Sequence, residues 1–160
     1  MRFAAGLVSA FLFVAPALAN MMPPPVESYE RAGEAAFAFV ENFNAGNIEG
    51  IASTYTDAGD FIWVENGTIT FKSKDEAIEG MKQRLAASPG ARLETANGWK
   101  ITPAGTGGSL ITAEFTLYRK APETGEETPV VSGVMTLMLR LENAEWRIVN
   151  GHTSSAISMK

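Results

Sequence analysis

The sequence predicts a single α+β domain in which a curved antiparallel sheet wraps around N-terminal helices. Two observations predict this class. Apolar residues recur with a helical period only in the first half of the 160-residue chain, whereas strands rich in Thr, Val, Ile and aromatic residues follow, separated by Gly-containing turns. Helices that precede a run of consecutive strands are typical of α+β folds. The length is that of one hydrophobic core.

Residues 1–19 are predicted to be a secretory signal. Arg2 supplies the basic residue, and the apolar run that ends at Val14 is shorter than the ~20 residues that a membrane-spanning helix needs. Ala17-Leu18-Ala19 suits signal peptidase. An uncleaved anchor or a buried N-terminal helix is the alternative. We therefore expect a periplasmic or secreted protein, cut after Ala19, with no membrane span after cleavage.

A short linker is predicted over residues 20–26, because it contains three consecutive prolines at 23–25. Each proline lacks an amide donor and restricts the residue before it, so the segment is expected to be extended and semi-rigid. The domain is then predicted to occupy residues 27–157.

Apolar residues at spacings of three and four predict a first helix over residues 26–45, with one apolar face that carries Tyr29, Ala32, Ala36, Phe39, Val40 and Phe43. Gly46 is expected to end this helix. Asn47 is expected to cap a second, short helix that reaches Tyr55.

A hairpin and a third helix follow. Strands are predicted at 61–64 and 68–71, joined by the turn signal Asn66-Gly67. Ser73 and Glu76 have the spacing of a capping box and predict a helix that stops at 88–90, where the sequence reads Ser-Pro-Gly.

Three long strands and a closing strand complete the chain, at 92–102, 109–120, 130–142 and 146–155. Asn97-Gly98 predicts a bulge or bend in the first of them. Strict alternation in the closing strand places one set of residues on a common face: Trp146, Ile148, Asn150, His152 and Ser154. That face is apolar near its start and polar near its end, as expected for a cavity with a polar floor or mouth.

Composition excludes several kinds of function. The chain has no Cys, one His and a net charge of −5. The lack of Cys excludes a thiol nucleophile, an iron–sulfur site and a Cys-based zinc site, and a single His argues against zinc held by imidazoles. The acidic balance argues against nucleic acid as a partner, since its binders gather Lys and Arg on one face. We expect no metal and no cofactor.

Three segments carry a family resemblance: Phe39 to Tyr55, Trp63 to Ile78, and the closing Trp146 to Ser154. Together they resemble the SnoaL-like, nuclear-transport-factor-2-like superfamily, above all its SnoaL-like and calmodulin-kinase-association-domain-like branches. The resemblance implies a conical, half-open cavity between the sheet and the first helix, and a homodimer through the convex face of the sheet. It implies no chemistry, because the superfamily contains isomerases, cyclases, dehydratases, ligand binders and assembly domains.

Ketosteroid isomerase of this superfamily needs a carboxylate base and an oxyanion hole made of a Tyr and a protonated Asp. An ungapped overlay of its first-helix motif places the tyrosine at Phe39 and the base at Trp63. The strand predicted to carry the second Asp, 130–141, contains no carboxylate. We therefore do not expect ketosteroid isomerase chemistry.

A dehydratase of the scytalone type is the second enzymatic hypothesis, and its catalytic His is His152, the single histidine of the chain. Its neighbour is one of Asp57, Asp60 or Glu114, with Tyr55 or Tyr118 as a hydroxyl. A general acid or base in this role contributes roughly 10²–10⁴-fold to a rate. The alternative is that His152 only satisfies a hydrogen bond with Asn150 or Ser154.

Aromatic and neighbouring residues form the candidate binding set, namely Phe39, Phe43, Tyr55, Trp63, Trp99, Phe115, Met135, Asn150 and His152. Aromatic side chains of about 150–250 Å² also fill cores without any ligand. Three functions stay open: a protein that binds a small, largely apolar or amphipathic molecule, an acid–base isomerase, cyclase or dehydratase that uses His152, and a dimeric assembly module.

Overall fold

The structure is a computed structural model, and it describes residues 26–156. The predicted signal, residue 157 and all of the predicted linker except its last residue lie outside this part, so signal and linker stay predictions. Three helices and six strands are described: α1 (Val26–Asn44), α2 (Ile48–Thr54), β1 (Ile62–Glu65), β2 (Thr68–Phe71), α3 (Lys74–Ala87), β3 (Arg92–Pro103), β4 (Gly108–Lys120), β5 (Glu127–Glu142) and β6 (Glu145–Ala156). Every predicted element is confirmed, and β5 begins three residues earlier than predicted.

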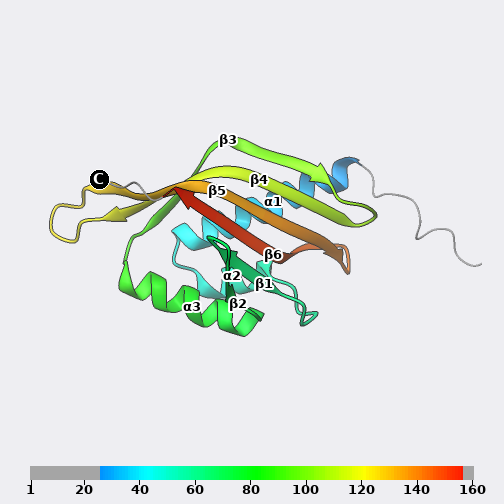
Figure 1. Cartoon of the computed structure of the whole chain (residues 1–160), viewed down its shortest axis with the longest axis horizontal. Coiled ribbons are helices and arrows are strands. Elements are labelled where there is room, and N and C mark those ends of the chain that lie inside the picture. Colours follow the sequence, from blue (N-terminus) through cyan, green and yellow to red (C-terminus); the bar gives the residue numbers. More distant parts are fainter. Residues whose placement is uncertain (1–25, 157–160) are drawn as a thin grey trace, which may run out of the picture.

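The strands form one curved, unclosed sheet in the order β2-β1-β6-β5-β4-β3. Strands β1 and β6 pair in parallel, and the other neighbours are antiparallel. Helix α1 lies across the concave side of the long strands and packs against β3, β4 and β6, whereas α3 lies beside the β1–β2 hairpin (Figure 1). The predicted α+β architecture is therefore confirmed, with one parallel pair in its sheet.

The predicted caps and turns explain where the elements start and stop. The Asn47 side chain accepts a hydrogen bond from the Gly50 amide at 3.0 Å, and Ser73 accepts one from the Glu76 amide at 3.2 Å. Asn66-Gly67 turns the hairpin with φ of 50° and 80°, the positive values that a type I′ turn requires. The irregularity expected at Asn97-Gly98 is also present, between Ala96 and Lys100.

A β-bulge in β6 corrects one prediction about the closing strand. Met138 of β5 pairs with Asn150 and Leu139 pairs with Ile148, so Val149 is an extra residue on β6. Because one extra residue reverses the alternation, Trp146 and Ile148 point inward while Asn150, His152 and Ser154 point to the outer face. The predicted common face for these five residues was wrong, since alternation alone carries no sign of a bulge.

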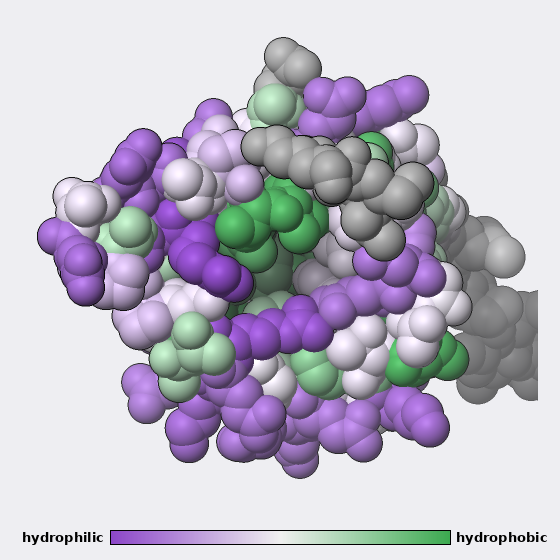
Figure 2. Space-filling view, turned by 60° about the vertical axis from the view of Figure 1, so that its left-hand side comes forward, coloured by the Kyte–Doolittle hydropathy of each residue, from purple (hydrophilic) through white to green (hydrophobic). Residues whose placement is uncertain are grey.

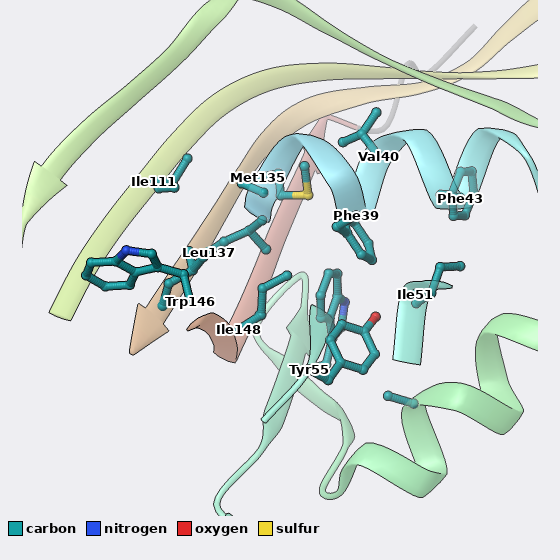
Figure 3. Close-up of a cluster of buried hydrophobic side chains, with 14 of the residues drawn as sticks. Phe39, Val40, Phe43, Ile51, Tyr55, Ile111, Met135, Leu137, Trp146 and Ile148 are labelled. Atoms are coloured by element: carbon teal, nitrogen blue, oxygen red, sulfur yellow. The ribbon is translucent and has the colours of Figure 1, made fainter. Parts of the chain in front are cut away.

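A continuous apolar core lies between α1 and the concave face of the sheet. Figure 3 shows Phe39 of α1 facing Tyr55, with Met135, Leu137 and Ile148 of the central strands to one side of them. Leu137, Ile148 and Tyr55 are fully buried. The aromatic rings of Tyr55 and Phe61 pack with their centroids 4.6 Å apart.

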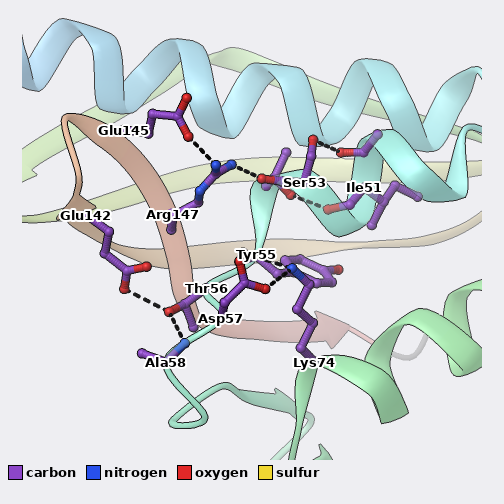
Figure 4. A network of polar contacts seen from close by, with 12 residues as sticks. Ile51, Ser53, Tyr55, Thr56, Asp57, Ala58, Lys74, Glu142, Glu145 and Arg147 are labelled. Carbon is purple, nitrogen blue, oxygen red and sulfur yellow. Dashed lines mark hydrogen bonds and ion pairs between the residues drawn. The ribbon is translucent and has the colours of Figure 1, made fainter.

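Polar contacts tie the loop after α2 to the end of β5. The Thr56 hydroxyl donates to Glu142 at 2.7 Å, and Arg140 donates to both oxygens of Asp60 at 2.6 and 3.1 Å. Figure 4 shows the contact of Thr56 with Glu142 together with two further groups of contacts, Lys74 with Asp57 and Arg147 with Glu145 and the Ser53 carbonyl. The loop is thereby fixed over one end of the core. No helix among residues 26–156 has the length and apolar character needed to cross a membrane.

Candidate ligand cavity

A cavity of about 410 Å³ opens at the end of the core opposite this loop. Figure 2 shows hydrophobic side chains in a hollow that hydrophilic residues border. Its walls come from α1, α3, β1 and the inner faces of the long strands, and the lining residues are Phe39, Phe43, Trp63, Glu65, Asn66, Met81, Arg84, Leu85, Ala87, Ser88, Ala91, Leu93, Phe115, Leu117, Val131, Met135, Thr153 and Ser155. Cavities that hold small molecules measure about 300–1,000 Å³, so this one has a suitable size.

The floor of the cavity is aromatic. The rings of Phe39 and Trp63 pack with centroids 5.7 Å apart, and both are at most 2% exposed. Trp63 packs against Gly151 of β6, where a Cβ atom would come within 2.1 Å of the indole ring. Gly151 is therefore the residue that makes room for Trp63, and the indole closes the floor.

An ion pair forms one side of the rim. Arg84 of α3 donates two hydrogen bonds to Glu65 of β1, at 2.5 and 2.8 Å. Glu65 Oε1 also accepts the indole N–H of Trp63 at 3.1 Å, and the Arg84 guanidinium lies 5.2 Å from the centre of the Phe71 ring. The hydrogen-bonded carboxylate of Glu65 raises the pKa of Arg84 above its ordinary value. This cluster joins α3 to the hairpin and places one cation and one anion at the opening.

Neutral polar groups form the other side of the rim. Asn66 Oδ1 accepts the Ser155 amide at 2.8 Å and the Ser155 hydroxyl at 3.1 Å. Thr153 lines the same side, next to Glu65 in the parallel pairing of β1 and β6. Apolar walls with a few polar groups at the opening are the usual composition of a ligand pocket.

Tyr55 lies directly behind the floor. Its ring packs on Phe39 and Trp63, with centroids 6.0 and 6.4 Å away, and burial raises the pKa of its phenol. The hydroxyl is buried and has no hydrogen-bond partner among the described residues. Tyr55 does not line the cavity, so its contribution is to support the two aromatic residues that do.

The structure brings five of the predicted binding residues together around the cavity: Phe39, Phe43, Trp63, Phe115 and Met135. Trp99 is partly buried and borders a separate depression next to the β3 bulge. Asn150 and His152 lie on the outer face because of the β6 bulge, opposite Met138 and Thr136 of β5. The predicted catalytic residue is therefore not among the groups that line the cavity.

The outer face of the sheet also exposes apolar side chains. Val134 is 41% and Met138 42% exposed, and Ile62 and Leu110 contribute further apolar area. This is the convex face through which a homodimer was expected. The homodimer stays a prediction.

Sequence reasoning missed the two charged residues of the rim. Arg84 was hidden between Met81 and Leu85, which mark the apolar side of α3. Glu65 did carry a signal, because it follows Phe61 and Trp63 at spacing two and so occupies an inward-facing position of β1. A carboxylate on the inner face of an aromatic strand needs a partner, and that is how the ion pair could have been found.

Within residues 26–156 no three His, Cys, Asp or Glu side chains are grouped in a way that would hold a metal ion.

The family comparison matches residues 34–158 to the model of the SnoaL-like domain. The chain belongs to the SnoaL-like domain family. This confirms the resemblance drawn from the three sequence segments. A comparison with curated proteins gave no match.

Solved structures show the same fold. A candidate dehydratase of the nuclear-transport-factor-2-like family from Streptomyces avermitilis superposes with a TM-score of 0.73 at 19% identity, over 84% of this chain and 100% of that one. A protein of unknown function with a cystatin-like fold from Nostoc punctiforme superposes with a TM-score of 0.69 at 17% identity, over 86% of this chain and 97% of that one. A nuclear-transport-factor-2-like protein from Salmonella enterica superposes with a TM-score of 0.70 at 10% identity, over 84% of this chain and 94% of that one. At these identities the likeness is one of fold.

Proposed function

We propose that this SnoaL-like protein, once exported, binds a small, largely apolar molecule in its cavity. The observation that carries the proposal is the open hollow of about 410 Å³ whose floor and walls are aromatic and aliphatic. Transfer of an apolar ligand from water into such a site is favourable by roughly 25 cal/mol for each Å² of apolar surface that is buried. The fold already supplies these walls, so binding requires little ordering of the protein.

The residues around the cavity support binding over ketosteroid isomerase chemistry. Phe39 and Trp63, the positions onto which the overlay places the tyrosine and the base, pack against each other as the floor. Glu65 is the carboxylate of the lining, and its oxygens already accept three hydrogen bonds, from Arg84 and Trp63. Both oxygens of this carboxylate are therefore already engaged by donors of the protein.

The acid–base hypothesis required His152 within hydrogen-bond reach of a molecule in the cone. His152 lies on the opposite face of the sheet from Met135 and Leu137, beside Val64 and Thr136. We therefore propose the binding function and not an enzyme that uses this histidine.

Equilibrium dialysis with naphthalene tests the proposal. Leu117→Trp places a large ring inside the cavity, and we expect it to weaken naphthalene binding by at least about tenfold, a change of 1.4 kcal/mol. Leu110→Trp is the matched control, because Leu110 lies on the same strand but on the outer face. The proposal is overturned if the wild-type protein does not bind naphthalene, or if the two variants weaken binding equally.

A further inference from the structure

We infer that the ion pair of Glu65 with Arg84 makes the cavity selective for uncharged amphipathic ligands whose polar end is a hydrogen-bond acceptor, and that it excludes carboxylates of the same shape. The inference rests on the proposed binding function and specifies its ligand class. It follows from three features of the rim: its net charge, the state of its carboxylate and the groups that remain free to bind.

The net charge of the lining is zero. Arg84 and Glu65 are the two charged residues in it, and every other polar residue of the described lining is an amide or an alcohol. Their side chains are 44% and 25% exposed, and the two hydrogen bonds between them measure 2.5 and 2.8 Å. A paired arginine of this kind attracts an approaching anion less than a free arginine does, because the adjacent carboxylate repels the same anion.

The carboxylate of Glu65 is already occupied. Oε1 accepts from Arg84 and from the indole of Trp63, and Oε2 accepts from Arg84. A ligand carboxylate that took the two N–H groups now bonded to Glu65 would have to displace Glu65, and it would leave that charge and the indole N–H without their partner. Unpaired groups of this kind carry the full cost of desolvation. A ligand carboxylate that bound the other N–H groups of Arg84 would lie close to the like charge of Glu65.

The groups that remain free at the rim are mostly donors. A guanidinium has five N–H groups, and two of those of Arg84 point to Glu65. Asn66 uses its oxygen for Ser155, and among residues 26–156 its side-chain nitrogen has no partner. A ligand that ends in an ester, amide or hydroxyl oxygen can accept from these donors without disturbing the ion pair. The rim therefore favours a neutral acceptor.

Three probes with one ring system test the inference by equilibrium dialysis: naphthalene, methyl 2-naphthoate and 2-naphthoate. For the wild-type protein we expect the ester to bind at least about tenfold more tightly than the carboxylate, because only the carboxylate is repelled by the charge of Glu65. Glu65→Gln keeps the shape of the side chain and removes its charge. We expect it to strengthen 2-naphthoate binding at least about tenfold and to change ester binding less than about threefold.

The double variant Glu65→Gln with Arg84→Gln is the control, because it restores a neutral rim; we expect the preference for the ester to return. If Glu65→Gln does not fold, two other measurements decide the question. They are the ratio of ester to carboxylate affinity in the wild-type protein and the carboxylate affinity of Arg84→Gln, which should be weaker than that of the wild-type protein. A wild-type protein that binds ester and carboxylate equally, or a Glu65→Gln variant with an unchanged ratio, overturns the inference. Failure of all three probes to bind overturns the proposed function itself.

Discussion

The two ends of the hydrophobic interior differ in how they are closed. At the end near the β5–β6 turn, which we call the filled end, Leu139, Trp146 and Ile148 are at most 5% exposed and the ion-paired loop after α2 lies over them. At the other end, which we call the hollow end, Val131 and Leu117 of the same sheet border an open cavity. One sheet thus supports a packed core and an open cavity.

The positions of the helices explain this difference. Helix α1 packs against β3, β4 and β6, whereas α3 packs against α2 and β2. At Gly80 a Cβ would lie 2.3 Å from the Phe71 ring, so α3 approaches the hairpin very closely at this point. Because α3 is held on the hairpin, a space remains between α3 and the inner face of the long strands. The cavity is therefore a consequence of where α3 is anchored.

The largest expected effect is a difference in how much a truncated side chain destabilises the fold at each of the two ends. Leu139→Ala removes a fully buried side chain at the filled end and should lower the free energy of unfolding by about 2–5 kcal/mol. Leu93→Ala, at the wall of the hollow end, should cost less than about 2 kcal/mol, because its side chain already lacks packing partners on the cavity side. Urea unfolding measures both. Equal losses would contradict the description of one end as packed and the other as hollow.

The floor between the two ends provides the second prediction. Gly151→Ala should displace the Trp63 indole, since the new methyl group would lie 2.1 Å from the ring. We expect a loss of about 1–3 kcal/mol in the free energy of unfolding, as for other overpacked sites, together with a shift in tryptophan fluorescence. Thr153→Ala, two residues along the same face of β6, is the control and should leave the fluorescence unchanged. Normal stability of Gly151→Ala would show that Trp63 has room to move.

The sequence predicted the fold more completely than it predicted the residues of the site. Helix periods, the Asn47 and Ser73 caps and the Asn66-Gly67 turn are local signals, and each produced the element that it predicts. The site depends on contacts between distant segments. The single extra residue at Val149 moved His152 to the outer face, and no local pattern marks it. The ion pair of Glu65 with Arg84 joins a strand to a helix 19 residues later, so its geometry depends on how α3 docks.

The aromatic residues show a second limit of prediction from the sequence. Phe39, Phe43 and Tyr55 were all predicted to be inward-facing, and all three are buried. Periodicity assigns a residue to the inner side of an element, but it does not say whether a neighbour or a cavity lies there. Phe43 therefore lines the cavity, while Tyr55 supports it from behind.

The smallest expected effect concerns the loop that closes the filled end. Hydrogen bonding from Arg140 holds the pKa of the Asp60 carboxyl below its ordinary value. Since the folded state then binds fewer protons than the unfolded state, the pair stabilises the fold above the unfolded pKa of about 3.9, and this contribution is lost as the pH falls below it.

Asp60→Asn should therefore lower the free energy of unfolding at pH 7, and the difference from the wild-type protein should shrink as the pH falls from about 5 to about 3. The side chains of Arg140 and Asp60 are 38% and 53% exposed, so solvent screening limits the effect to less than about 1 kcal/mol. Glu123→Gln, in the exposed β4–β5 loop, removes the same charge without an effect on this loop. Thermal unfolding across that pH range measures both variants. A difference for Asp60→Asn that stays constant with pH would mean that the loop is held by Thr56 and Glu142 and not by the charge of Asp60.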